Sequence, residues 1–340
     1  MRVAITADPT IPVPPELYGG IERIIDMLVR GLLRRGHEVT LFAHEDSEVP
    51  CRLVPYHGTD AQSVVDTFRN TLTVSRLAVA RPDVIHSFGR LAYLAPVLPL
   101  KVPKIMSYQR DPTPTRVRFA MGMARNGSLI FTGCSDHITE TLRRHAPAHT
   151  VYNGVPLDKY EFRASVAEDA PLVFLGRIAP IKGTHTAVDV ARRAGRRLVI
   201  AGNVPDDQQA FFREHVEPHL GDRIQYVGPV DDEEKNDLLG RAAAFLMPIE
   251  WEEPFGIVMA EALACGTPVI GTRRGAVPEV VTHGSTGFVC DTVDDMVTAV
   301  QNIGRLSRST CRERCEQCFS GRAIVDDYEA LYRQHAREQE

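Results

Sequence analysis

The sequence predicts an α/β protein made of two domains, each built around a parallel β-sheet. Its 340 residues exceed the roughly 100–200 residues of a typical single domain. Short apolar runs alternate with amphipathic helical stretches along the whole chain, which is typical of repeated strand–helix–strand units. The alternation falls into two series on either side of a polar, non-periodic stretch at residues 158–171. We therefore expect two doubly wound domains, joined by that stretch as a linker.

The first series forms the expected N-terminal domain, residues 1–157. The helix after the first strand is well defined, because Ile24, Leu28 and Leu32 recur at helical spacing and Gly36 supplies a stop. The strands expected in this domain are Val3–Ala7, Val39–Ala43, Val84–His86, Lys104–Ser107 and Leu129–Thr132.

The second series forms the expected C-terminal domain, residues 172–320, and a final segment, 321–340, carries a helical pattern near Ala323–His335. The expected strands are Leu172–Leu175, Leu198–Ala201, Ile224–Val227, Ala244–Met247, Pro268–Ile270 and Phe288–Cys290. Helical patterns follow several of them, at Ala187–Ala194, Gln208–His219 and Met296–Ile303. This alternation of strands and helices is the one that a parallel sheet requires.

The composition excludes several classes of protein. Hydrophobic residues make up 44% and charged residues 24%, which is incompatible with a disordered or collagen-like chain. The net charge of −5 argues against a nucleic-acid binder, which would carry a strongly basic face. The charge is uneven, however: residues 1–155 hold 18 basic and 14 acidic side chains, whereas residues 156–340 hold 21 and 30. Two interpretations of this asymmetry remain: random drift between the two domains, or a first domain that contacts an anionic acceptor or a membrane surface.

The N-terminus and the cysteines predict a cytoplasmic location. The chain enters an apolar strand directly after Arg2, without the features of a signal peptide. Seven cysteines in such a chain are typical of a reducing compartment. The apolar run Leu91–Leu100 contains two prolines and is far shorter than the roughly 20 residues of a membrane span. We expect a cytoplasmic protein that does not cross the membrane, although a peripheral contact with its inner face is compatible with the sequence.

Two glycine-containing loops follow expected strands at the positions where parallel sheets bind ligands. The first is Tyr18-Gly19-Gly20, which immediately precedes a helix and can bring backbone N–H groups to an anion. The second runs from Gly176 to Gly183, and its Arg177 and Lys182 are suited to hold a diphosphate. The alternative is that the glycines form simple turns and that the two cations are solvated surface charges without a ligand. Neither loop has the P-loop pattern.

The most informative segment runs from Glu250 to Leu263. Glu261 lies in a short apolar helix, so its carboxylate needs a partner, which can be a ribose diol, an internal arginine or backbone amides. Glu253 precedes the helix by a few residues, and Gly256 and Ile257 begin it, where free amides favour an anion. Two carboxylates eight residues apart suit the two ends of one extended ligand.

These motifs occur together in a recognisable order. They are Tyr18-Gly19-Gly20, Arg35–Val39, Asn153-Gly154-Val155, Gly176-Arg177 with Lys182-Gly183, Glu253–Glu261 and Gly275–Val280. They resemble the motifs of the retaining GT-B glycosyltransferases of family four, and Glu253–Glu261 matches the E-x7-E element of that family. The resemblance covers nearly the whole chain. It implies a GT-B fold, in which two Rossmann-like domains face a central cleft and the last helix crosses back to the first domain.

The resemblance also implies roles for individual residues. Arg177 and Lys182 would hold the donor diphosphate, together with backbone amides at Gly20. Glu261 would bind the ribose, Glu253 the transferred sugar, and the main chain near Val227 would border the base. No metal and no further cofactor is expected, because the cations and the helix start can stabilise the departing phosphate.

Two positions depart from the family pattern. Relatives often have H-x-H where this chain has His86-Ser87-Phe88, so His86 is a candidate to lie near the reacting sugar, with packing at the strand end as the alternative. The acceptor side by analogy includes Tyr18 and the loop that contains Arg110, where relatives often show histidines. Arg110 is therefore either a contact for an anionic acceptor or a solvated surface residue.

The function that this resemblance implies is transfer of a sugar, with retention, from a nucleotide-sugar to a hydroxyl of a glycan, lipid-linked or small-molecule acceptor. A UDP-sugar is favoured as the donor, and GDP- and ADP-sugars are alternatives. A nucleotide-sugar epimerase or a non-catalytic nucleotide-sugar binder of the same fold is the competing interpretation. Cys311, Cys315 and Cys318 have the spacing of a cluster loop, but they also share one helical face, so we expect buried thiols there.

Overall fold

The computed structural model describes residues 1–15, 19–60, 62–125 and 127–337. The chain divides into two compact units. The first comprises residues 1–153 and 321–340, and the second comprises residues 154–320. Residues 158–171, which were expected as a linker, are therefore part of the second unit.

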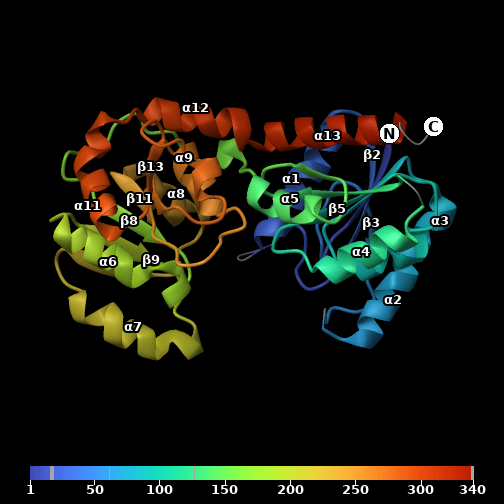
Figure 1. Ribbon diagram of the computed structural model, residues 1–340, viewed down its shortest axis with the longest axis horizontal. Coiled ribbons are helices and arrows are strands. Elements are labelled where there is room, and N and C mark those ends of the chain that lie inside the picture. The colour runs from blue at the N-terminus through green and yellow to red at the C-terminus, as the bar shows by residue number, and fades with distance from the viewer. Residues whose placement is uncertain (16–18, 61, 126, 338–340) are drawn as a thin grey trace. The chain divides into compact units, whose positions relative to one another are not determined.

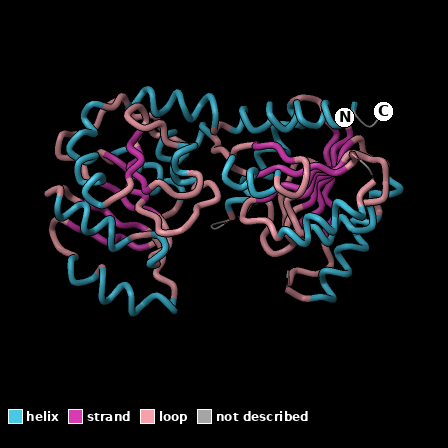
Figure 2. Tube along the Cα trace, in the orientation of Figure 1, coloured by secondary structure: helices cyan, strands magenta, loops and turns pink. Residues whose placement is uncertain are grey.

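The first unit contains a seven-stranded parallel sheet with the order β3-β2-β1-β4-β5-β6-β7 (Figure 2). Its strands are β1 (Arg2–Thr6), β2 (Glu38–Ala43), β3 (Arg52–Pro55), β4 (Val84–Ser87), β5 (Lys104–Tyr108), β6 (Leu129–Gly133) and β7 (Ala148–Thr150). Five of them confirm the strands expected from the sequence. The two edge strands, β3 and β7, were not predicted.

The helices of the first unit pack on this sheet (Figure 1). They are α1 (Gly20–Arg34), α2 (Val64–Ser75), α3 (Leu77–Ala80), η1 (Leu91–Val97), α4 (Pro114–Met123), α5 (Asp136–Arg143) and α13 (Gly321–Arg337). Gly36 follows α1 in the left-handed region, as the sequence predicts for a helix stop. The final helix α13 packs against α1, where Arg35 donates to Asp326 and Glu329 at 2.6 Å each.

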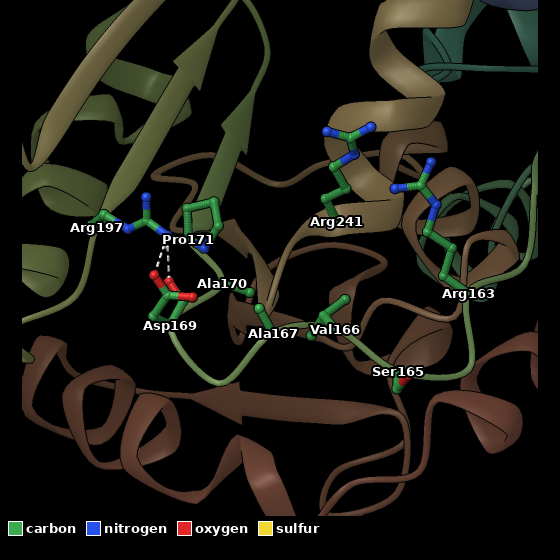
Figure 3. Close-up of a pocket in the computed structure, with 9 residues that line it drawn as sticks. All are labelled: Arg163, Ser165, Val166, Ala167, Asp169, Ala170, Pro171, Arg197 and Arg241. Carbon is green, nitrogen blue, oxygen red and sulfur yellow. Dashed lines mark hydrogen bonds and ion pairs between the residues drawn. The ribbon is translucent and has the colours of Figure 1, made fainter.

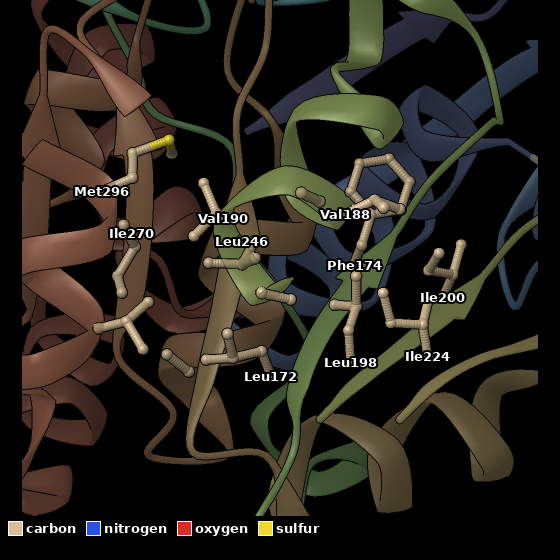
Figure 4. Close-up of a cluster of buried hydrophobic side chains, with 14 of the residues drawn as sticks. Leu172, Phe174, Val188, Val190, Leu198, Ile200, Ile224, Leu246, Ile270 and Met296 are labelled. Atoms are coloured by element: carbon tan, nitrogen blue, oxygen red, sulfur yellow. The ribbon is translucent and has the colours of Figure 1, made fainter. Parts of the chain in front are cut away.

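The second unit contains a six-stranded parallel sheet with the order β10-β9-β8-β11-β12-β13. Its strands are β8 (Leu172–Leu175), β9 (Leu198–Ala201), β10 (Ile224–Gly228), β11 (Ala244–Met247), β12 (Val269–Thr272) and β13 (Gly287–Cys290), which confirms all six expected strands. A buried core that includes Leu172, Phe174, Leu198, Leu246 and Ile270 joins the sheet to its helices (Figure 4).

The helices of the second unit follow its strands in order. They are η2 (Leu157–Lys159), η3 (Pro180–Lys182), α6 (Thr184–Arg193), η4 (Asp206–Gln208), α7 (Gln209–His215), η5 (Glu217–His219), α8 (Asp232–Arg241), α9 (Ile257–Ala264), α10 (Val277–Val280), α11 (Val293–Asn302), η6 (Ile303–Arg305) and α12 (Arg308–Cys318). The pattern at 208–219 therefore forms three short helical pieces rather than one helix. Cys311 and Cys315 are buried on one face of α12, as expected, and Cys318 is half-buried.

In each sheet the order in which successive strands are added reverses once. The candidate site lies at one of these reversals. In the second sheet β8 lies between β9 and β11, so the strand order changes direction between β8 and β11. In the first sheet the same change occurs between β1 and β4. Ligands of open parallel sheets bind beyond the carboxyl ends of the strands at such a switch point. The segment after β8 carries Lys182, the loop after β11 carries Glu253, and the helix α9 that follows this loop carries Glu261.

Candidate functional site

The loops after β8 and β11 are joined through their backbones. The carbonyl oxygen of Ile181 accepts a hydrogen bond from the Glu250 amide at 2.9 Å. Gly183 lies in the left-handed region at φ 72°, and a Cβ atom there would collide with the carbonyl of Pro248. Only glycine allows this close approach. Lys182, which directly precedes Gly183, is thereby fixed beside the second loop.

Lys182 and Glu253 form an ion pair at this junction. The Lys182 Nζ atom donates to Glu253 Oε2 at 2.7 Å, and Trp251 Nε1 donates to the same oxygen at 3.0 Å. The ammonium group also lies 4.6 Å from the centre of the Trp251 ring, which is a cation–π contact. Glu253 Oε1 has no hydrogen-bond partner within the described ranges. The carboxylate is thus held by two donors on one oxygen, and its other oxygen is available.

The backbone of Glu253 is fixed from a third loop. Its carbonyl oxygen accepts a hydrogen bond from the Ala276 amide at 2.9 Å. Gly275 has φ 50°, and a Cβ atom there would collide with the Glu253 backbone. The amide of Gly275 also donates to Glu252 at 2.6 Å. These contacts explain why the segment that begins at Gly275 accompanies the E-x7-E element.

Glu261 is buried in α9, with only 5% of its surface exposed, and it has two partners there. Its Oε1 atom accepts from Lys235 Nζ at 2.7 Å and from the Tyr160 hydroxyl at 2.6 Å. The prediction that this carboxylate needs a partner is confirmed, but neither an arginine nor a backbone amide provides it. Oε2 has no hydrogen-bond partner in the described part of the chain, so one oxygen is available to a ligand.

The other expected donor residues also belong to the second unit. Arg177 is exposed in the loop after β8 and has no ion-pair partner among the described residues. Gly256 is the left-handed N-cap of α9, and Ile257 begins the helix. Val227, at the end of β10, is half exposed. Each residue therefore follows, or begins a helix beyond, the carboxyl end of a strand.

In the first unit, the predicted residues have different surroundings. Gly20 begins α1, and no atom lies within 4 Å of the position a Cβ would take. Arg110 is exposed in the loop after β5. Tyr18 lies outside the described residues.

His86 does not have the surroundings of a sugar-binding group. Its side chain is completely buried in β4, and its ring packs against Phe88. Nδ1 is hydrogen-bonded to the Tyr332 hydroxyl and Nε2 to the Ser107 hydroxyl, both at 2.6 Å. Both ring nitrogens are therefore occupied by groups of the first unit. These surroundings favour the interpretation in which His86 packs at the strand end, and we do not include it in the proposed site.

The buried histidine predicts a loss of stability in mild acid. Burial lowers the pKa of His86 to about 3, whereas the free imidazole titrates near 6.5. Below pH 6.5 the unfolded chain therefore binds a proton that the folded chain excludes, and stability falls as the pH approaches 3. At about pH 5 the expected loss is roughly 2 kcal/mol relative to neutral pH. Thermal unfolding at both pH values should show this loss in the wild type and a smaller one in His86→Asn; equal losses would contradict it.

The structure also contains a pocket that none of the predicted site residues lines (Figure 3). Its volume is about 240 Å³, and it lies before the first residues of β8 and β9. Its arginines are paired with acidic neighbours, Arg197 with Asp169 and Arg163 with Asp237. It is therefore located at the amino ends of the strands, opposite the candidate site.

Two searches of the described residues gave negative results. No group of three or more histidine, cysteine or acidic side chains in the described ranges is arranged to hold a metal ion. No helix there combines the length and the apolar character needed to cross a bilayer.

The sequence did not indicate three residues of this site. Trp251, the only tryptophan of the chain, was a detectable signal because it stands two positions before Glu253. Lys235 follows the acidic run 231–234, which is typical of a helix start, and Asp231 caps α8 there. Tyr160 lies in the polar stretch expected as a linker. Neither Lys235 nor Tyr160 shares a motif with Glu261, so only the fold brings them together.

Comparisons with known proteins identify the family and the fold. Residues 159–318 match the family model described as "Glycosyl transferases group 1", and residues 18–159 match "Glycosyltransferase Family 4". The putative glycosyltransferase YtcC of Bacillus subtilis is 26% identical over 90% of this chain and 83% of its own length. AviGT4, a glycosyltransferase involved in avilamycin A biosynthesis, superimposes with a TM-score of 0.73 at 26% identity, covering 99% of this chain and 98% of its own.

A third relative has been solved with ligands. Anabaena HepE in complex with UDP has a TM-score of 0.74 at 18% identity and covers 98% of this chain and 100% of its own. The two Rossmann-like parallel sheets and the structural neighbours place the chain in the class of GT-B glycosyltransferases. The chain belongs to glycosyltransferase family 4, the retaining hexosyltransferases that use nucleotide-sugar donors.

Proposed function

We propose that this protein transfers a sugar, with retention of configuration, from a UDP-sugar to a hydroxyl group of a glycan, lipid-linked or small-molecule acceptor. The observation that carries the proposal is the ion pair of Lys182 with Glu253 on the second unit, together with the pair of Lys235 with Glu261 eight residues further along the chain. Each carboxylate has one oxygen held by the protein and one available. Such an arrangement suits a ligand with hydroxyl groups at both ends and a diphosphate between them.

The cations of this site act on the leaving group. Cleavage of a sugar–phosphate bond increases the negative charge on the diphosphate and creates positive charge at the anomeric carbon. Lys182 and Arg177 hold the diphosphate, and the amides at Gly256 and Ile257 add the positive end of α9. Once the donor is bound these groups surround the diphosphate, and they stabilise the charge that develops in the transition state without further reorganisation. On binding, Lys182 moves from Glu253 to the phosphate, while Trp251 keeps its hydrogen bond to the carboxylate.

The two glutamates bind the two sugars of the donor. Glu261 Oε2 accepts from the ribose hydroxyls while Lys235 and Tyr160 hold Oε1 in position. Glu253 Oε1 accepts from hydroxyls of the transferred sugar. The main chain at Val227 borders the base. The arrangement thus assigns one oxygen of each glutamate to the donor and one to the protein.

In our proposal the first unit contributes to both substrates. The amide of Gly20, at the unobstructed start of α1, approaches the donor diphosphate. Arg110 and Tyr18 serve the acceptor, and Arg110 favours an anionic one. We place the reaction in the cytoplasm, which is supported by seven free cysteines.

The choice of UDP rests on relatives. HepE was crystallised with UDP, with UDP and glucose, and with UDP-glucose. We therefore favour a uridine nucleotide over guanosine and adenosine nucleotides for this chain.

Trp251 offers a direct test, since it is the only tryptophan and contacts both Lys182 and Glu253. Titration with UDP should change its fluorescence at lower concentrations than titration with GDP or ADP. Release of UDP from UDP-glucose or UDP-N-acetylglucosamine should then depend on an added acceptor. No fluorescence response to any nucleotide would contradict the donor site. Consumption of the donor without an acceptor, giving an epimerised sugar, would favour an epimerase instead.

A further inference from the structure

The carboxyl end of helix α9 depends on a side chain from another helix. Glu261 lies in the last turn of α9. The carbonyls of residues 261–263 accept backbone amides of residues 265–267, but the carbonyl of Ala264 has no backbone partner among the described residues. It accepts instead from Arg312 Nη1 of α12 at 2.8 Å. A cation at this position satisfies an orphan carbonyl and suits the negative end of the helix dipole.

The same nitrogen of Arg312 also holds Tyr160. Nη1 donates to the Tyr160 carbonyl at 3.0 Å, and the Tyr160 hydroxyl donates to Glu261 Oε1 at 2.6 Å. The contacts form a closed ring. It runs from Glu261 along α9 to Ala264, then through Arg312 to the backbone of Tyr160, and through the tyrosine side chain back to Glu261. Because one atom joins the two sides of this ring, Arg312 fixes the separation between Tyr160 and the end of α9.

Arg312 is itself held in place. Its Nε atom donates to Glu316 Oε1 at 2.6 Å, and only 19% of its side chain is exposed. Helix α12 packs against α9 (Figure 1), and the Cys315 thiol donates to the Ala260 carbonyl at 3.3 Å. Arg308, one turn earlier, donates to four backbone carbonyls of the second unit. The guanidinium group of Arg312 is therefore in position before a ligand binds, as the support of a binding site requires.

We propose that Arg312 is a positioning residue for donor binding. By joining Tyr160 to the end of α9, it orients the carboxylate of Glu261 so that Oε2 faces the ribose hydroxyls. The inference rests on the proposed function, in which Glu261 binds the ribose. It goes beyond that function, because it assigns part of the ribose recognition to a residue of α12 that does not contact the donor in our proposal.

Fluorescence titrations of Trp251 with UDP and with 2′,3′-dideoxy-UDP, which lacks the ribose hydroxyls, test the inference. Arg312→Met removes both hydrogen bonds of Nη1 and keeps a long apolar side chain. Its affinity for UDP should fall about threefold to tenfold, the contribution of one hydrogen bond, because Glu261 is less well oriented. Its affinity for the dideoxy analogue should not change. Arg312→Lys should keep most of the preference for UDP, because a single ammonium group can donate to both carbonyls.

Arg314→Met is the matched control. Arg314 lies on the same helix, and its guanidinium group also donates to a backbone carbonyl, that of Glu279 in α10 at 2.8 Å. None of its hydrogen bonds within the described ranges reaches Tyr160 or α9. This variant should lose a similar amount of stability in thermal unfolding and keep the full preference for UDP. In Glu261→Ala, adding Arg312→Met should not weaken UDP binding further, because the carboxylate that Arg312 orients is absent.

The possible outcomes separate this inference from the proposed function. If no nucleotide changes the fluorescence of the wild type, or if the wild type binds UDP and its dideoxy analogue equally, the proposed ribose site fails and this inference fails with it. If the wild type prefers UDP and Arg312→Met keeps that preference, only the inference is overturned. An equal loss of preference in Arg314→Met would also overturn it, since Arg312 would then serve only to stabilise the fold.

Discussion

Replacing Lys182 with alanine should lower kcat/KM for sugar transfer by about 10² to 10³, the usual effect of removing one preorganised group that stabilises developing negative charge. The ammonium group is held by Glu253 Oε2 and by the face of Trp251, so it is positioned before the donor arrives. The loss should appear mainly in kcat, because the charge on the leaving diphosphate grows in the transition state. Steady-state rates with the donor identified by fluorescence titration would measure it.

Lys182→Ala also removes one positive charge from the protein, so a second variant that loses an exposed lysine elsewhere serves as the control. Lys159→Ala removes an exposed lysine of the second unit whose nearest carboxylate, on Asp232, lies 3.9 Å away. An exposed pair of this kind contributes little, so its activity should stay within about twofold of the wild type. Lys182→Arg keeps the positive charge but replaces the compact ammonium group with a planar guanidinium, so it should retain more activity than Lys182→Ala. Wild-type kinetics in Lys182→Ala would remove the lysine from the proposed mechanism.

Most of the fold could be predicted because interior strands leave a strong signal. Strands such as Leu172–Leu175 are covered on both faces, so they appear as uninterrupted apolar runs. The two missed strands lie at the edges of the first sheet. Arg52–Pro55 is exposed at both ends, and Ala148–Thr150 has three residues, one of them His149. Such short, half-polar segments resemble loops, and only pairing with a neighbouring strand makes them part of the sheet.

Some residues of the site could likewise be predicted from sequence motifs, whereas others are defined only by the fold. Lys182, Glu253 and Glu261 were recognised because their chemistry is unusual where they stand in the sequence. The residues that hold Glu261 in position could not be predicted from the sequence. Lys235 and Tyr160 approach Glu261 only through the packing of α8 and of residues 154–160 against α9. The two interpretations of His86 could not be separated for the same reason. A histidine at a strand end can face a ligand or the interior, and the hydroxyls of Tyr332 and Ser107, distant in sequence, decide for the interior.

Replacing Glu261 with alanine should weaken donor binding by about tenfold to a hundredfold, the effect of losing hydrogen bonds to a charged group. The variant also removes the closer of the two carboxylate partners of Lys235, Glu261 at 2.7 Å, and leaves Asp232 at 3.2 Å, so local rearrangement is a second cause of weaker binding. A ligand lacking the ribose hydroxyls separates the two causes. The wild type should prefer UDP to 2′,3′-dideoxy-UDP, and Glu261→Ala should bind both equally weakly.

Tyr160→Phe provides the matched control for that comparison. It removes the hydroxyl that donates to Glu261 Oε1 at 2.6 Å but keeps the carboxylate, the lysine and the aromatic ring. A hydrogen bond to a charged group contributes about 1.5–3 kcal/mol. Tyr160 does not contact the donor in our proposal, so this loss acts on binding only through the position of the carboxylate, and donor affinity should fall by no more than about fivefold. The preference for UDP over the dideoxy analogue should survive in Tyr160→Phe. If the preference also survived in Glu261→Ala, the ribose would be bound elsewhere, and Glu261 would serve only to anchor Lys235 and Tyr160 beneath the site.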